Sequence, residues 1–445
     1  MHLLPQLLFA ALLATATYLF AKRIGLIRKV ILLGSPQDIE TNRATRLRNL
    51  LLLAFGQKKM FTNPLVAVMH FIIYAGFIII NIEVLEIVLD GLLGTHRLFA
   101  APLGGLYPFL INSFEWLALG VLITCVVFLV RRNVLKLKRF ISADLNGWPR
   151  SDANYILLTE IVLMGLFLTM NAADAALQQK GVESYVQHGT GAYQVSQWLL
   201  PLLNGLEVKT LIAIERGAWW LHIIGILAFL NYLPYSKHLH ILFAFPNAWY
   251  ARPQGQVAAM DNMPAIQKEV ALAMGQDIST HPILSQLPDE PPAQFGAKDV
   301  TDLSWKNLLD AYSCTECGRC SSACPANTTG KLLSPRSIMM KTRDRAEQLG
   351  KQLGAPPPTA DQPQPTLLHD FITVEELRAC TACNACVEAC PVSISPLDII
   401  LKLRRHLILD ESNSPGEWNA MFGNIENNFA PWKFSPDTRE AWATE

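Results

Sequence analysis

The sequence feature that most constrains the fold is a cysteine pattern that occurs twice. Each copy reads Cys-x2-Cys-x2-Cys-x3-Cys-Pro, the first from Cys314 to Pro325 and the second from Cys380 to Pro391. Soft thiolates suit iron–sulfur clusters, and three sulfurs in so tight a loop fit three corners of an iron–sulfur cube. The fourth corner stays open, so the chain must fold with the two copies facing each other.

In this spacing, the cysteine beside the proline binds the cluster of the other copy. We therefore predict two [4Fe–4S] clusters with crossed ligands. The first cluster is assigned to Cys314, Cys317, Cys320 and Cys390, and the second to Cys380, Cys383, Cys386 and Cys324.

Structural zinc and disulfides are the alternatives to clusters. Zinc ribbons use two well-separated Cys-x2-Cys pairs, whereas each copy here holds four cysteines and a proline in twelve residues. A disulfide framework does not suit the reducing compartment that the charge distribution predicts below.

Long apolar stretches account for a composition that is 51% hydrophobic and only 17% charged. The first stretch is followed, not preceded, by basic residues, so we expect a retained span and not a signal peptide. The net charge of zero gives no case for nucleic acid as a partner. Five stretches are long enough to cross a bilayer as helices: residues 4–20, 65–89, 110–130, 155–176 and 211–233.

Basic residues are distributed unequally between the predicted loops. Nine Lys and Arg residues lie between the first two spans and six between the third and fourth, whereas the opposite side has Arg97 and three others. By the positive-inside rule the N-terminus lies outside and the cysteines lie in the cytoplasm. We expect a multi-pass protein of the bacterial cytoplasmic (inner) membrane, in contact with its lipids.

The fold class predicted is all-α: a five-helix transmembrane bundle followed by a helical two-[4Fe–4S] ferredoxin-like domain. Helices are expected at 265–274, 303–312, 334–349, 374–379 and 396–409. The predicted parts are a membrane domain at 1–245, a Pro-rich tether at 246–297, the cluster domain at 298–412 and a mostly irregular tail at 413–445 whose aromatic residues should pack on this domain or on a partner.

Histidines in or near the spans are candidate haem ligands. His70 lies in the second span, His222 in the fifth, and His238 and His240 at its cytoplasmic end. Neutral imidazole is the usual ligand of electron-transfer haem, and polar groups in spans are costly. On a helix continuing past Pro234, His222 and His240 would share one face, five turns apart. Depth favours His70 with His240, with His222 as the alternative; otherwise these side chains only hydrogen-bond neighbouring helices.

This region resembles a known family of cytochromes. Residues 221–222 (LH) and 233–240 (LPYSKHLH) are similar to the fifth helix of the cytochrome b subunit of respiratory nitrate reductase. They also resemble cytochrome subunits of membrane-bound heterodisulfide reductase and sulfite-reduction complexes. The resemblance implies a haem b on His70 and His240. A second haem on His222 would need another ligand, such as His96 or a methionine, because Ile80 stands at the matching position.

The cluster part carries a second resemblance. Residues 310–320, with TGK at 329–331 and LSPR at 333–336, resemble the ferredoxin part of heterodisulfide-reductase-like iron–sulfur oxidoreductases, as do residues 424–428 and 431–432. Many members continue into a catalytic CCG domain, whose cysteines this sequence lacks. The resemblance therefore implies a separate partner, a CCG-domain iron–sulfur oxidoreductase or another cytoplasmic redox subunit.

Acidic residues inside the spans suggest proton chemistry. Glu83 and Glu86 lie toward the outer side, with Glu115, Asp174 and Glu215 at similar depth. They could accept protons from a quinol, or they could mark the interfacial ends of the spans.

Together these features predict an electron-transfer subunit that links the quinone pool, through haem b and two [4Fe–4S] clusters, to a cytoplasmic partner oxidoreductase. No nucleophile–base pair, phosphate loop or flavin fingerprint is visible, so substrate chemistry is expected in another subunit. The alternative is a haem-free membrane anchor that carries clusters for a partner enzyme.

Overall fold

The chain folds into helices joined by turns. The computed structural model describes residues 3–39, 41–186, 193–252, 263–288, 294–353, 364–438 and 440–444. Within these ranges the structure contains no β-strand, only two isolated bridges. The predicted all-α class is confirmed.

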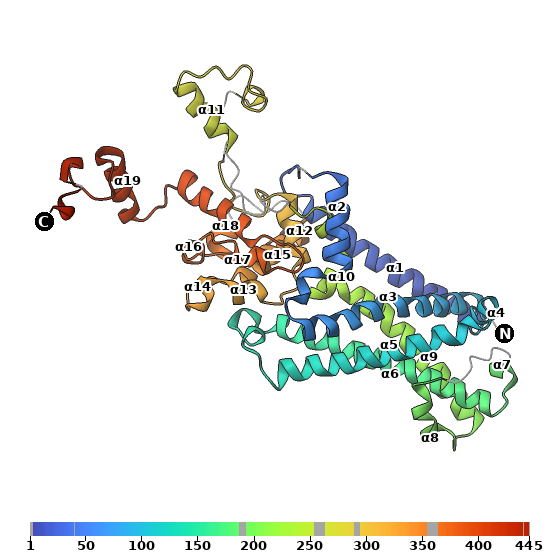
Figure 1. Cartoon of the computed structure of the whole chain (residues 1–445). Coiled ribbons are helices and arrows are strands. Elements are labelled where there is room, and N and C mark those ends of the chain that lie inside the picture. Colours follow the sequence, from blue (N-terminus) through green and yellow to red (C-terminus); the bar gives the residue numbers. More distant parts are fainter. Residues whose placement is uncertain are drawn as a thin grey trace.

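Among the described residues, five helices are long and apolar enough to cross a membrane, which confirms the five predicted spans. Helix α6 lies between α5 and α9, and α3 packs on α5, while α1 contacts α3 and α9 at the edge of the bundle (Figure 1). The helices are α1 (Leu3–Ile31), α3 (Pro64–Leu93), α5 (Leu106–Asn133), α6 (Trp148–Gln179) and α9 (Val208–Tyr232).

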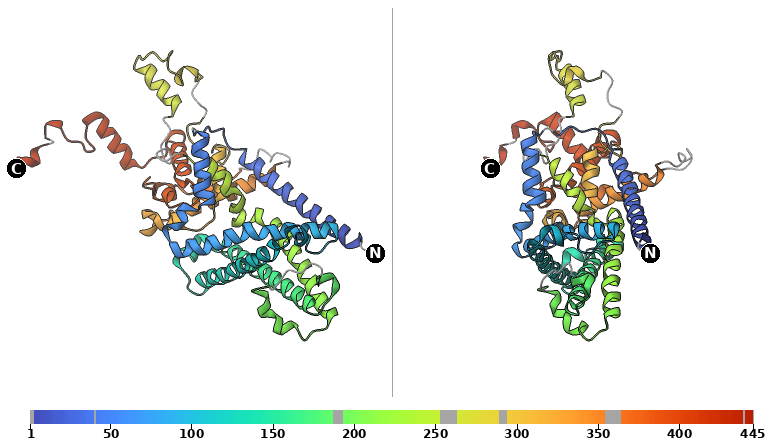
Figure 2. Two further views of the ribbon diagram at one scale, coloured as in Figure 1. Left: turned by 45° about the vertical axis from the view of Figure 1, so that its right-hand side comes forward. Right: turned by 90° about the vertical axis from the view of Figure 1, so that its right-hand side faces the viewer.

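The bundle has two different ends. The N-terminus lies at the end away from the cluster domain, which we call the far end, and Figure 2 shows α1 running from there to the cluster domain. The far end carries three short helices, α4 (Ala100–Leu103), α7 (Glu183–Val186) and α8 (Leu200–Leu203). The cluster side carries α2 (Arg43–Asn49), a π-helical turn at Leu50–Phe55, a 3₁₀ turn at Lys58–Thr62 and α10 (His240–Trp249).

The fifth membrane helix does not continue past Pro234, contrary to our expectation. Helix α9 ends at Tyr232 and is followed by two 3₁₀ turns, with Ser236 extended between them. Proline lacks the N–H that a continuing helix needs, and its ring clashes with the preceding turn. His222 and His240 therefore lie on two separate helices and not on one face of a single helix.

The cluster domain is a set of short helices around the two cysteine loops. All four helices predicted between residues 303 and 409 are present. Capping boxes start two of them, at Ser304 and Thr373. The domain contains α12 (Trp305–Ser313), α13 (Arg319–Ala323), α14 (Pro325–Thr328), α15 (Pro335–Gln352), α16 (Val374–Arg378), α17 (Ala385–Glu388) and α18 (Pro396–Arg405).

The last turns of α1 belong to the core of the cluster domain. Ile27, Val30 and Ile31 are buried in the same apolar cluster as the residues of α12 and α15. A Cβ on Gly350 of α15 would lie 2.7 Å from Val30, so the two helices are in close contact. The cluster domain is thus completed by the first membrane helix.

Two further helices protrude from the body. Helix α11 (Pro264–Ala273) lies in the predicted tether, parts of which fall outside the described residues. The tail was predicted to be mostly irregular, but it forms α19 (Gly416–Asn428), which extends away from the cluster domain (Figure 1). Its aromatic residues are largely exposed, Phe429 at 76%, so they do not pack on the cluster domain. Packing on a partner stays a prediction.

Candidate functional site

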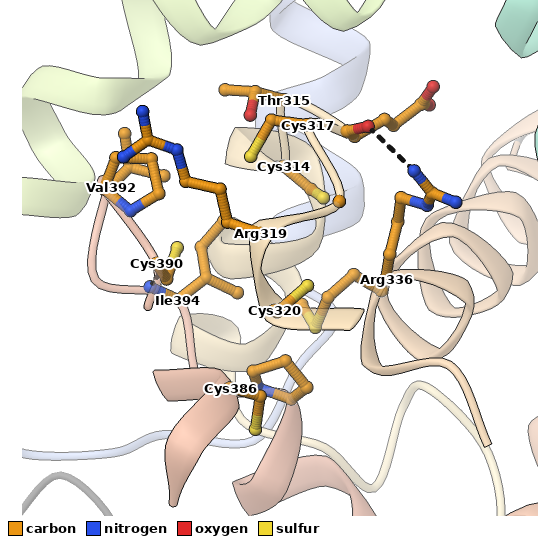
Figure 3. A pocket seen from close by; sticks show the side chains of 15 residues that line it. Cys314, Thr315, Cys317, Arg319, Cys320, Arg336, Cys386, Cys390, Val392 and Ile394 are labelled. Carbon is orange, nitrogen blue, oxygen red and sulfur yellow. Dashed lines mark hydrogen bonds between the residues drawn. The ribbon is translucent and has the colours of Figure 1, made fainter. Parts of the chain in front are cut away.

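The first cysteine loop lines a cavity that the second loop completes. Cys390 lies opposite Cys314, Cys317 and Cys320, and Figure 3 shows the sulfur of Cys386 directed to the other side. Four thiols around one cavity have the softness and number that a [4Fe–4S] cube requires. The remaining lining residues are Thr315, Glu316, Gly318, Arg319, Arg336, Met339, Pro391, Val392, Ile394 and Pro396.

The two cysteine loops repeat one backbone conformation. Glu316 and Ala382 have φ values of 52° and 53°, and Gly318 and Asn384 have values of 74° and 68°. Each pair occupies matching positions around the second cysteine of its copy. Left-handed residues in such a loop turn backbone N–H groups toward one point, as an anionic cluster requires. A Cβ at Gly318 would lie 2.6 Å from the Arg336 guanidinium, so a glycine is needed there.

The other four cysteines form a second group. Cys324, from the first copy, interacts electrostatically with Cys380 and Cys386 of the second. Burial raises the pKa of Cys314 and Cys386 to about 12, so without a metal these thiols stay protonated. Cys383 is the one exposed cysteine among the nine. The second group therefore reaches the surface.

Two of the candidate histidines face the same region from different helices. His70 Nδ1 donates to Gln57 Oε1 at 3.0 Å, and His240 Nδ1 donates to the Lys237 carbonyl at 3.0 Å. The two rings interact electrostatically, and the His238 ring centroid lies 5.4 Å from that of His240.

A hydrogen bond at Nδ1 fixes the ring and leaves Nε2 as the metal-binding atom. Within the described part of the chain, neither Nε2 has a hydrogen-bond partner. His70 and His240 therefore each present a ring nitrogen that could bind iron.

The histidine pair lies against the first cysteine loop. Arg319, between Cys317 and Cys320, donates to the Lys59 carbonyl at 3.1 Å, close to where α3 begins. Lys237, three residues before His240, forms an ion pair of 2.6 Å with Glu316. Both helices that carry the pair are thus joined to the first loop.

His222 lies elsewhere, inside the bundle. Its side chain is 1% exposed, and its Nδ1 donates to the Leu163 carbonyl at 3.0 Å. Ile80 is buried and offers no ligand, while His96 pairs with Asp174 at 3.5 Å and packs on Tyr185. The contacts of His222 are those of a histidine bonded to a neighbouring helix, and they supply no second imidazole.

The acidic residues of the spans form a buried network at the far end. Arg97 is its centre: it donates to Glu83 at 3.0 Å, to Asp174 at 3.2 Å, to Asn171 at 2.6 Å and, through its backbone, to Asp90 at 2.8 Å. Glu115 and Glu215 are equally buried. These carboxylates are therefore not exposed markers of helix ends. A small cavity beside the network is lined by Glu86, Ile87, Asp90, His96, Arg97, Met170, Glu215 and Trp219.

Several residues of these sites were not assigned roles from the sequence. Arg97 was counted only as a loop charge, Lys237, Glu316 and Arg336 lay within the resembling segments without a role of their own, and Gln57 carried no signal. Each makes its key contact with a residue far away in the sequence. The only hint in the sequence was that Arg97 is a basic residue on the side of the membrane that carries few basic residues.

The cysteine region matches a known domain family. Residues 313–394 match the 4Fe-4S dicluster domain, a range that contains all eight cysteines of the two copies. The chain therefore carries an iron–sulfur domain of the two-cluster type. No solved structure shows significant similarity to the chain.

Curated relatives extend the similarity to the membrane part. A probable iron-sulfur-binding oxidoreductase, FadF of Bacillus subtilis, is 27% identical over 99% of this chain and 61% of its own length. An EtfAB:quinone oxidoreductase of Syntrophomonas wolfei is 25% identical over 90% of this chain and 54% of its own length.

A third relative matches a shorter part of the chain. It belongs to a ferredoxin:CoB-CoM heterodisulfide reductase of Methanosarcina mazei and is 32% identical over 22% of this chain and 46% of its own length. The chain spans just over half the length of the two long relatives. With the five apolar helices, these similarities make the chain a membrane protein of iron–sulfur electron transfer.

Proposed function

We propose that the chain is a membrane electron-transfer subunit that links the quinone pool, through haem b and two [4Fe–4S] clusters, to a redox partner in the cytoplasm. His70 and His240 would hold the haem, which supplies one-electron chemistry when bound. The eight cysteines would hold the clusters in the crossed arrangement. The protein positions these groups and excludes water from them.

The observation that carries the proposal is that the segments carrying the two histidines are joined to the first cysteine loop. Two separate links, Arg319 to Lys59 and Lys237 to Glu316, hold them together. The second group of cysteines reaches the surface at Cys383. An electron would thus pass between a soluble partner and the membrane through the second cluster, the first cluster and the haem.

The comparisons and the charge distribution support the two ends of this route. The name of the Syntrophomonas relative supports a quinone as the membrane substrate. The basic loops at residues 21–64 and 131–150 lie on the cluster side, which favours a cytoplasmic cluster domain. A CCG-domain protein is the partner that the resemblance to heterodisulfide-reductase-like proteins favours.

The far-end network supports proton exchange with a quinone. Reduction of a quinone to a quinol consumes two electrons and two protons. The network buries six carboxylates, Glu83, Glu86, Asp90, Glu115, Asp174 and Glu215, around Arg97. Buried carboxyl groups within spans are typical of proton relays, so this network is where protons for the quinone would enter or leave.

Spectra of the purified protein test the proposal. We expect a b-type α-band after reduction by dithionite, together with roughly eight iron atoms per chain in clusters. His70→Ala should remove the band while cluster iron is retained. His369→Ala is the matched control, because its side chain is 42% exposed and lies in the cluster domain.

Two outcomes would contradict the proposal. A protein with full cluster iron and no α-band is the haem-free anchor. A His70→Ala variant that keeps all its haem would exclude the ligand pair. Purification in mild detergent should also yield a redox partner, and full activity of this polypeptide alone with a soluble substrate would argue against one.

A further inference from the structure

Lys237 contacts both the first cysteine loop and a candidate haem ligand. Its ammonium group forms an ion pair of 2.6 Å with Glu316 Oε2 and donates to the Pro149 carbonyl at 2.5 Å. Its backbone carbonyl accepts the Nδ1 hydrogen bond of His240 at 3.0 Å. Lys237 thus links the first cysteine loop to the imidazole of His240 through a single residue.

The backbone of Lys237 is fixed on both sides. Its N–H donates to Asp152 Oδ2 at 3.0 Å, and the hydroxyl of Ser236 donates to Oδ1 of the same carboxylate at 2.7 Å. Asp152 belongs to α6 and is 2% exposed. The turns that follow α9 are therefore anchored to the bundle. They are not loose enough to absorb a displacement of the Lys237 side chain.

Glu316 is fixed equally well on the cluster side. It stands between Cys314 and Cys317 with φ 52°, and its other oxygen pairs with Arg343 of α15 at 2.7 Å. The Glu316 carboxylate is 2% exposed. Both carboxylate oxygens thus have a cationic partner, Lys237 on one side and Arg343 on the other.

A buried ion pair contributes little net stability, since desolvation offsets the attraction between the charges. Such a pair does fix geometry, because Lys237 without Glu316 would be a buried cation facing only the Pro149 carbonyl. Lys237 and Glu316 thus specify how the loop and the imidazole face each other.

We propose that Lys237 and Glu316 are positioning residues for electron transfer between the first cluster and the haem. The inference rests on the proposed function. With both groups bound, the step would move one electron from a reduced cluster to ferric haem iron, with no change of bond or proton. Its rate depends on the separation that this ion pair sets.

A pre-steady-state experiment on the full chain in detergent tests the inference. Protein reduced by dithionite, and freed of the excess, is mixed anaerobically with menadione. Haem oxidation is followed at the α-band and cluster oxidation at the broad cluster absorption. In Lys237→Met we expect unchanged haem and iron content, unchanged initial haem oxidation, and cluster oxidation slowed severalfold, because the rate of electron transfer falls with the separation of the two groups.

Controls separate positioning from folding. Lys341→Met removes the lysine of a 2.6 Å ion pair with Glu376 that lies within the cluster domain, and it should leave both rates unchanged. Glu316→Gln, which keeps the side-chain volume, should slow cluster oxidation as Lys237→Met does. His70→Ala protein gives the rate of direct cluster oxidation by menadione.

The outcomes of the two proposals are distinguishable. If the unmodified protein shows no α-band, the proposed function fails. If it shows the band and Lys237→Met with full cofactor content oxidises its clusters at the normal rate, only the positioning role is overturned. Equal slowing in Lys341→Met would also overturn it, because the effect would then be general.

Discussion

Replacing Ile27 by alanine should destabilise the cluster domain, although Ile27 belongs to the first membrane helix. Its side chain is 0% exposed within the shared core. The change removes three carbons, or about 2.4 kcal/mol at about 0.8 kcal/mol each. The cavity left behind raises the expected loss to about 3–4 kcal/mol. For a domain of this size that corresponds to a decrease in Tm of about 10–20 °C.

The measurement is the loss of cluster absorption on heating in detergent, at one fixed scan rate because unfolding of such a protein is often irreversible. Leu8→Ala, in the same helix but 59% exposed on its lipid-facing side, is the control and should change the midpoint little. If the two variants lose their cluster absorption at the same temperature, the shared core is refuted. If that common temperature is far below that of the unmodified protein, α1 stabilises the protein only through its packing in the bundle.

Two further predictions concern the cluster domain. Cys390→Ala should abolish the spectrum of the first cluster and Cys324→Ala that of the second, and electron paramagnetic resonance showing the reverse would exclude crossed ligands. Arg252 and Lys402 hold the pKa of Asp398 below its usual range despite burial, so its stabilising contribution is complete above about pH 4 and is lost as the pH falls further. Asp398→Asn should lower Tm at pH 7 and flatten its decline below pH 4; a parallel decline would contradict this.

The sequence predicts the parts of this fold that depend on local pattern. Apolar length identifies all five spans, and helical periodicity with caps identifies the helices around the cysteine loops. The break after Tyr232 was missed because apolar residues continue on both sides of Pro234. Helix α19 was missed because two glycines and several asparagines weaken its helical signal.

Contacts between distant segments could not be predicted. The pairs Lys237–Glu316 and Arg97–Asp174 join residues more than seventy positions apart, and neither pairing leaves a periodic trace. The burial of α1 in the cluster domain is of the same kind. Ile27, Val30 and Ile31 are as suitable for lipid as for a protein core, so composition does not tell which of the two surrounds them.

The two predicted sets of cluster ligands differ in their access to water, and this decides where the protein is vulnerable. Cys314 and Cys390 are buried, whereas Cys383 is exposed. Oxidation of thiolate sites follows their exposure. Air should therefore damage the outermost cofactor first. A protein handled aerobically would keep its membrane redox groups but lose its exchange with soluble proteins.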